Sequence, residues 1–168
     1  MDQERCSIIF SSATGNTKLL AETLHGALPL EQCAYFGPWN REIPETPVVY
    51  VGFWTDKGNA DPDTLALLKE LRNKKVFLFG TAGFGESPAY FEKVLCAVRA
   101  ALDDSNQILG TFMCQGKMPQ AVKDRYLRMN AQPEHPANID ALIANFDRAL
   151  SHPDEADLER LRQTVRAL

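Results

Sequence analysis

Short, almost uninterrupted apolar runs alternate along this chain with stretches whose apolar residues recur at helical spacing. The runs cover residues 8–10, 48–53, 76–79 and 108–113, and a weaker one, read as an edge strand, covers residues 32–36. Strands that are apolar throughout are typical of parallel sheets covered on both faces. Their alternation with helices predicts right-handed βαβ units. We therefore expect a single doubly wound α/β domain over residues 1–168.

Helix beginnings and loops complete this prediction. Asp61 followed by Pro62 pairs a good N-cap residue with a proline suited to the first helical turn. Further helices are expected over residues 18–28, from 87–88 onward, over 120–129 and 139–150, and in a C-terminal segment over 153–168. In doubly wound sheets, ligands bind beyond the carboxyl ends of the strands. The loops after the first, third and fourth strands are therefore the candidate functional site.

Composition excludes several classes of protein. The 168 residues are 45% hydrophobic with a net charge of −4, which suits a globular domain and disfavours nucleic-acid binding. The longest apolar runs fall far short of the roughly 20 residues that cross a bilayer, so no membrane association is expected. The first residues are charged and lack the apolar core of a secretory signal. Four cysteines outside any C-x-x-C pair predict a cytoplasmic protein with reduced, mostly buried thiols and no metal site.

The loop after the first strand, residues 11–17, has the chemistry of a phosphate site. It offers hydroxyls at Ser12, Thr14 and Thr17, an amide at Asn16, and backbone N–H groups at the start of a helix. Gly15 permits a sharp turn and a close approach to a ligand, and the helix dipole favours an anion there. The loop has neither the lysine of a Walker A sequence nor the G-x-G-x-x-G of a dinucleotide site. An N-cap cluster with no ligand is the alternative.

The other two loops suit a planar ring. Trp54 lies where the third strand ends, and a Gly58–Asn59 turn pair follows it. After the fourth strand, Phe84 stands between two glycines, so that the backbone beside its ring is free to face a ligand. Together with the first loop they indicate a planar heterocycle on a phosphate tail. The alternatives are an ordinary core aromatic for Trp54 and a turn residue folded back onto the core for Phe84.

Residues 8–17 with Ala21 resemble the FMN phosphate signature of the flavodoxin family, and residues 75–85 are similar to the family's fourth strand and flavin loop. The resemblance implies a flavodoxin-like five-stranded parallel sheet of order 2-1-3-4-5, helices on both faces, and non-covalently bound FMN. It leaves residues 116–137 as an extra segment and either Trp54 or Lys57 as the residue stacked on the flavin. The residues that it assigns to the cofactor are Ser12, Ala13, Thr14, Gly15, Asn16, Thr17, Trp54, Thr55, Asp56, Lys57, Gly58, Asn59, Thr81, Ala82, Gly83, Phe84 and Gly85.

Within the family, the chain resembles a subgroup associated with bilirubin reductase (BilS-type). The resemblance implies an electron-transfer protein that shuttles electrons between a reductase donor and an acceptor enzyme such as a bilirubin reductase, and it implies no catalytic residue of its own. Two other functions stay open. An FMN-dependent reductase of the quinone or protoporphyrinogen type would use the same FMN loops for its own turnover. A phosphorelay receiver domain shares the strand order, but residues 10–12 lack the acidic pair that would bind its magnesium.

Overall fold

The structure is a computed structural model, and it describes residues 4–85 and 87–168. Five parallel strands form the sheet in the order β2-β1-β3-β5-β6, and the short β4 pairs antiparallel with β3. The predicted order is confirmed, since the five predicted strands are these parallel ones. The strands are β1 (Cys6–Phe10), β2 (Cys33–Gly37), β3 (Val48–Asp56), β4 (Asn59–Ala60), β5 (Lys75–Ala82) and β6 (Gln107–Gln115).

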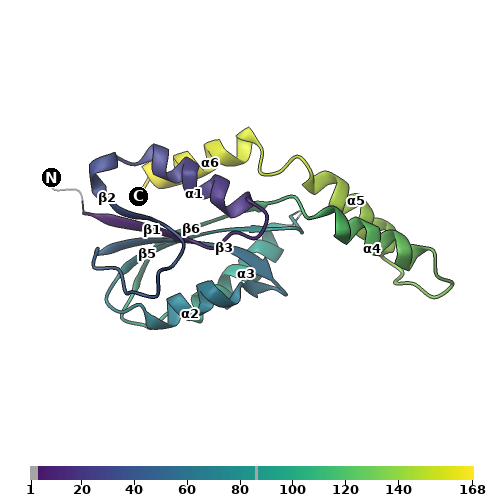
Figure 1. Cartoon of the computed structure of the whole chain (residues 1–168), viewed down its shortest axis with the longest axis horizontal. Coiled ribbons are helices and arrows are strands. Elements are labelled where there is room, and N and C mark those ends of the chain that lie inside the picture. Colours follow the sequence, from purple (N-terminus) through teal and green to yellow (C-terminus); the bar gives the residue numbers. More distant parts are fainter. Residues whose placement is uncertain (1–3, 86) are drawn as a thin grey trace.

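Four helices cover the two faces of the sheet (Figure 1). The helices α1 (Asn16–Ala27) and α6 (Glu155–Arg166) lie on one face, and α2 (Pro62–Glu70) and α3 (Pro88–Arg99) lie on the other. Successive strand residues point to opposite faces. Ile8 accordingly packs in the core under α1 and α6, while Ile9 packs in the core under α2 and α3. This explains why the strands had to be apolar throughout.

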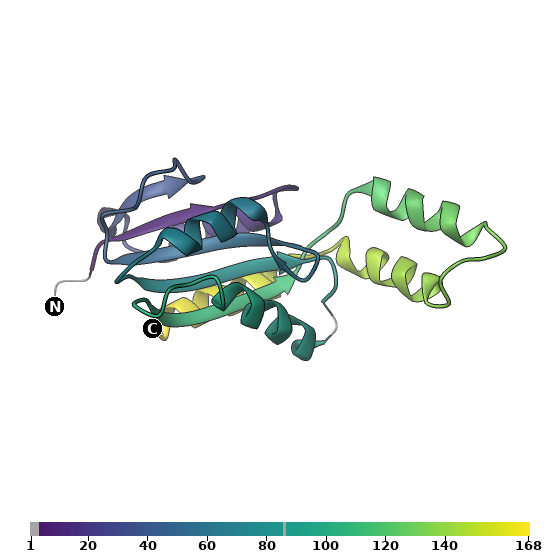
Figure 2. The same cartoon turned by 90° about the horizontal axis from the view of Figure 1, so that it is seen from below.

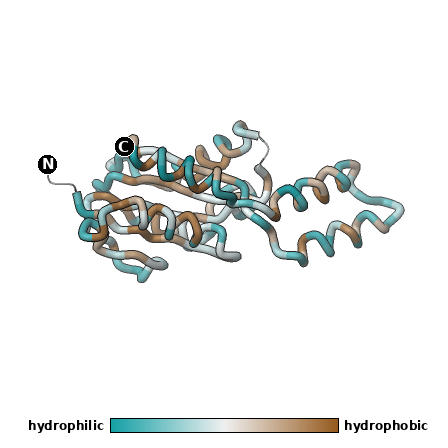
Figure 3. The backbone as a smooth tube through the Cα atoms, turned by 90° about the horizontal axis from the view of Figure 1, so that it is seen from above, coloured by the Kyte–Doolittle hydropathy of each residue, from teal (hydrophilic) through white to brown (hydrophobic). Residues whose placement is uncertain are grey.

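Two helices do not lie on either face of the sheet, although helices were expected on both faces. The helices α4 (Gln120–Asn130) and α5 (Ile139–Ala149) form a hairpin that projects beyond the carboxyl ends of the strands and covers neither face (Figures 1 and 2). Tyr126, Ile139 and Phe146 form a small core between them. Tyr126 is the only buried residue of α4. Such a narrow apolar stripe can cover a partner helix but not a sheet, and the loop at the far end is hydrophilic (Figure 3).

The connection from β2 to β3 contains no helix. The glycine and prolines between residues 37 and 47 predict a loop there, and this is confirmed. A short 3-10 turn, η1 (Leu30–Gln32), precedes β2. The connecting loop runs on the same side of the sheet as α2 and α3 (Figure 1) and packs Trp39 against their core. The β1–β2 part of this face therefore has a loop where a crossover helix would lie.

Two expectations from composition can be compared with the structure. Among the described residues, none of the helices combines the length and the apolar character that a membrane crossing requires. All four cysteines are free, with Cys6 and Cys114 buried and Cys33 partly buried. Cys96 is exposed, so the expectation of mostly buried thiols is wrong for this residue. It lies on the outer face of α3, beside Glu92 and Arg99.

Candidate functional site

The three candidate loops meet at the carboxyl edge of the sheet. The hydroxyl of Thr17 donates to the carbonyl of Phe53 (3.0 Å) and lies 3.2 Å from the hydroxyl of Thr81. The hydroxyl of Thr55 donates to the carbonyl of Thr81 (2.8 Å). These bonds join the start of α1 to β3 and β5. The topology therefore brings together segments that the sequence separates by up to 64 residues.

The first loop forms a turn held by Ser12 at the start of the 12-residue helix α1. Ser12 Oγ accepts hydrogen bonds from the backbone N–H groups of Gly15 (3.1 Å) and Lys18 (3.3 Å), which fixes the loop in an open turn. Gly15 has a φ of +92°, a conformation that strains any residue with a side chain. Among the described residues, no acceptor is recorded for the backbone N–H groups of Asn16 and Thr17. Donors left free at a helix N-terminus suit a phosphate.

The side chains of Asn16 and Thr17 form hydrogen bonds to protein groups from neighbouring segments. Asn16 Nδ2 donates to the carbonyl of Lys117 (2.8 Å), in the segment after β6. Thr17 is 1% exposed, and its hydroxyl is bonded as described above. Both side chains therefore hold neighbouring segments in place. Ala13 and Thr14 lie exposed in the loop.

The segment after the third predicted strand is a β-hairpin. Trp54, Thr55 and Asp56 are the last residues of β3, and Asn59 begins β4 opposite Asp56. The two turn residues are Lys57 (φ +53°) and Gly58 (φ +81°). Positive φ at both central positions is the geometry of the tight hairpin turn that matches the twist of the strands. The expected Gly58–Asn59 turn pair is therefore wrong by one residue, since Asn59 is extended.

A buried carboxylate holds the base of this hairpin. Asp61 is 1% exposed, caps α2 by accepting from the backbone N–H and the hydroxyl of Thr64, and also accepts from the backbone N–H of Trp54 (3.3 Å). The Asp61 N–H donates back to the carbonyl of Trp54 (3.1 Å). The predicted N-cap is confirmed, and it has a second role that the sequence did not indicate. The cap fixes the direction in which the hairpin leaves the sheet.

The segment after β5 presents an aromatic ring between two tightly packed glycines. Thr81 and Ala82 are the last residues of β5. Phe84 is 40% exposed and makes an edge contact with the ring of Tyr90, so its ring is accessible at this edge. A Cβ on Gly83 would lie 2.5 Å from Met118 Sδ, and one on Gly85 would lie 2.5 Å from Gln115 Cβ. A side chain at Gly85 would collide with the start of the Gln115 side chain on β6, whereas one at Gly83 would displace the flexible end of Met118.

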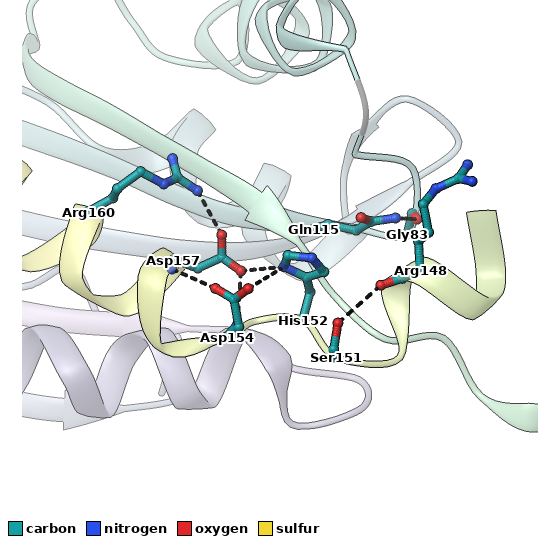
Figure 4. Close-up of polar contacts among 8 residues, drawn as sticks. All are labelled: Gly83, Gln115, Arg148, Ser151, His152, Asp154, Asp157 and Arg160. Atoms are coloured by element: carbon teal, nitrogen blue, oxygen red, sulfur yellow. Dashed lines mark hydrogen bonds and ion pairs between the residues drawn. The ribbon is translucent and has the colours of Figure 1, made fainter. Parts of the chain in front are cut away.

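Sequence reasoning missed the groups that hold this last loop. The carbonyl of Gly83 accepts from Gln115 Nε2 (2.9 Å) and from Asn145 Nδ2 (3.0 Å), and the two amides are bonded to each other at 3.0 Å. The first of these bonds is drawn in Figure 4. Asn145 is 6% exposed on α5 beside the apolar Phe146. A single amide in an apolar helical stripe was the available signal. The α4–α5 hairpin is therefore attached to the candidate site.

Comparison with known proteins identifies the class of this fold and site. The flavodoxin domain family matches residues 7–166, so the chain belongs to the flavodoxin family. Among curated proteins, the flavodoxin-like domain-containing protein BilS of Clostridium symbiosum is 38% identical over an alignment of 173 positions that covers 90% of this chain and 89% of the relative. The resemblance inferred from the sequence is confirmed. Membership also sets aside the phosphorelay receiver alternative.

Solved structures agree on the fold. Oxidised flavodoxin 2 from Bacillus cereus superposes with a TM-score of 0.54 at 14% identity, covering 98% of this chain and 99% of that one. A flavoprotein from Lactobacillus acidophilus in complex with FMN superposes with a TM-score of 0.52 at 14% identity, covering 66% of this chain and 93% of that one. The flavodoxin-like architecture therefore holds although the sequences have diverged widely.

Proposed function

We propose that this chain is an FMN-binding electron carrier that passes electrons from a reductase to an acceptor enzyme such as a bilirubin reductase. The observation that carries the proposal is the first loop, where Ser12 holds a turn whose following N–H groups, at Asn16 and Thr17, lack an acceptor among the described residues. These donors fit a phosphomonoester. The fold shared with an FMN-bound flavoprotein supports the same cofactor.

The chain's own residues would divide the work of holding FMN. Residues 12–17 would bind the phosphate through backbone N–H groups and the helix dipole. Residues 54–59 would border the ring on one side and residues 81–85 on the other, with the exposed ring of Phe84 available for stacking. FMN supplies the reversible uptake of electrons. The Thr55–Thr81 hydrogen bond fixes the spacing between the two ring loops, which keeps the site preorganised.

A carrier suits these loops better than an enzyme with its own turnover. Residues 11–17, 54–59 and 81–85 contain no histidine and no cysteine, and no general acid or base stands out among them. The acceptor in our proposal follows from the resemblance to the BilS-type subgroup, and the relative at 38% identity carries that name.

Titration of the FMN-free protein with FMN and with riboflavin tests the phosphate site. We expect FMN to bind about 100-fold more tightly than riboflavin, because two or more charge-assisted hydrogen bonds are lost with the phosphate. Gly15→Ala should weaken FMN binding and leave riboflavin binding unchanged. Gly26→Ala, at the other end of α1 with open space around its Cβ, is the matched control. Equal affinity for the two flavins would overturn the proposed site.

A second measurement separates a carrier from a reductase. The FMN-loaded protein alone should not turn over NADH or NADPH. With a flavin reductase as donor and a bilirubin reductase as acceptor, it should raise the rate of bilirubin consumption. Multiple turnovers of NAD(P)H with a quinone, by the pure protein, would instead establish the FMN-dependent reductase.

A further inference from the structure

A cavity lies beneath the helix-free connection between β2 and β3. It has a volume of about 520 Å³ and lies on the side of the sheet that α2 and α3 cover, next to the end of β1. Ile9, Val51 and Leu67 contribute apolar lining from β1, β3 and α2. Sites for small organic ligands are mostly apolar and span about 300–1,000 Å³. The cavity therefore has the size and character of such a site.

The loop over the cavity contains no helix, but contacts within the loop hold its conformation. The hydroxyl of Tyr35 donates to the carbonyl of Pro38. The indole N–H of Trp39 donates to the carbonyl of Glu42 (3.0 Å), and the guanidinium of Arg41 lies 4.7 Å from the centre of the Trp39 ring. These contacts fix the Trp39 ring at the cavity before a ligand binds, which lowers the entropy cost of binding.

Backbone strain occurs at the rim of the same cavity. Arg41 has a φ of +70°, in the left-handed region that a non-glycine residue rarely adopts. Such strain persists where surrounding contacts enforce it, and it gathers at ligand sites. At this position Arg41 contacts the Trp39 ring and also forms an exposed ion pair with Asp63 of α2, at 3.0 Å.

The charges at the cavity favour an anion. Lys18, Arg41 and Asp63 are its charged lining residues, which leaves an excess of one positive charge. Asp63 is already paired with Arg41. Lys18 is exposed on the first turn of α1 and forms no ion pair with any of the residues that the structure describes. The hydroxyls of Ser11 and Ser12 line the same side.

From these features we propose that the cavity binds an aromatic carboxylate. Its ring lies against Trp39, and its carboxylate faces Lys18 and Arg41. The site is separate from the proposed flavin site, since its lining includes no residue of the segments 54–59 or 81–85, and only Ser12 belongs to both. The inference therefore goes beyond electron transfer and does not depend on it.

Proton–nitrogen NMR of the two tryptophan indoles tests this with 2-naphthoate as the probe. Trp39 lines the cavity and Trp54 lies at the flavin loops, so each indole N–H signal reports on one site. In protein preincubated with FMN, 2-naphthoate should shift the Trp39 signal saturably at one equivalent and leave the Trp54 signal in place. The neutral isostere 2-naphthamide should bind roughly fivefold more weakly, the effect of one exposed ion pair. Trp39→Phe assigns the signals.

Two charge variants complete the test. Lys18→Gln should lower the affinity for 2-naphthoate to that for 2-naphthamide. Lys69→Gln, on the exposed last turn of α2 and outside the cavity lining, should change neither affinity. The proposal is overturned by an unshifted Trp39 signal, by a shift of Trp54 alone, or by equal binding of the acid and the amide. FMN loading is read separately from its absorbance, so a failure of the proposed function leaves this result interpretable.

Discussion

At the scale of single residues, Asp157 shows how a carboxylate is kept charged in a nearly buried position. Its side chain is 8% exposed, and its oxygens lie 2.6 Å from His152 Nδ1, 2.9 Å from the backbone nitrogen of Asp154 and 2.8 Å from Arg160 (Figure 4). Burial alone would raise its pKa, but the hydrogen bonds from these three groups outweigh burial and lower the pKa below its usual range. The carboxylate thereby fastens the start of α6 to the turn before it.

This pairing predicts a pH-dependent stability. A carboxyl whose folded pKa is lowered contributes fully above its unfolded pKa, about 3.9, and its contribution is lost as the pH falls through the lower folded value. Asp157→Asn should reduce the free energy of unfolding at pH 7 by about 1–3 kcal/mol, and the gap to wild type should shrink below about pH 4. Urea unfolding across this range measures it. The exposed Asp104→Asn is the control, and a gap that stays constant to pH 3 would contradict the assignment.

Thiol reactivity is a second property decided at single residues. Burial is the largest of the effects that raise the pKa of Cys6 to about 12, and burial also raises the pKa of Cys33 and Cys114. Cys96 is exposed on α3. Since the thiolate is the reactive form, a disulfide reagent at pH 8 should modify one thiol quickly and the other three slowly. Cys96→Ser should remove the fast phase of modification. A fast phase that remains in this variant would refute the prediction.

At the scale of elements, Asp61 links a helix to a hairpin. Asp61→Ala removes the N-cap of α2 and the acceptor of the Trp54 N–H, so we expect a loss of about 2 kcal/mol in the free energy of unfolding. Asp63→Ala, two residues along, breaks only an exposed ion pair and should cost less than about 0.5 kcal/mol. Chemical denaturation compares the two. Similar losses would show that the cap contributes little.

The elements also show how far the sequence could predict this molecule. Apolar periodicity gave the parallel strands, because a strand covered on both faces needs apolar residues at every position. It could not give the turn at Lys57 and Gly58, since the register between β3 and β4 decides which residues take positive φ. The loop residues 12–17 were identified, but the partners of Asn16 and Thr17 come from segments distant in the chain. The position of α4 and α5 beyond the sheet could not be predicted, because it depends on contacts between residues distant in the sequence.

At the scale of the whole molecule, the α4–α5 hairpin is the part that the sheet supports least. Its core is formed by its own residues, and the bond from Asn145 to Gly83 is among the few contacts that attach it. Regions with few buried apolar contacts open at lower free energy than the core. The prediction of a single domain over residues 1–168 is therefore best tested at this hairpin.

Native-state hydrogen exchange tests this behaviour. Amides of α4 and α5 should exchange at least about tenfold faster than those of β3 and β5, because they open without unfolding the sheet. The helices α1 and α6, which pack on the sheet, provide the internal comparison. Exchange of the hairpin at the same free energy as the central strands would show that the chain unfolds as one unit.

The carbonyl of Gly83 accepts two hydrogen bonds, one from Gln115 of β6 and one from Asn145 of α5. Asn145 belongs to α5, so a side chain of the hairpin is bonded one residue away from the exposed ring of Phe84. The position of the projecting hairpin and that of the ring loop are therefore linked through one backbone carbonyl.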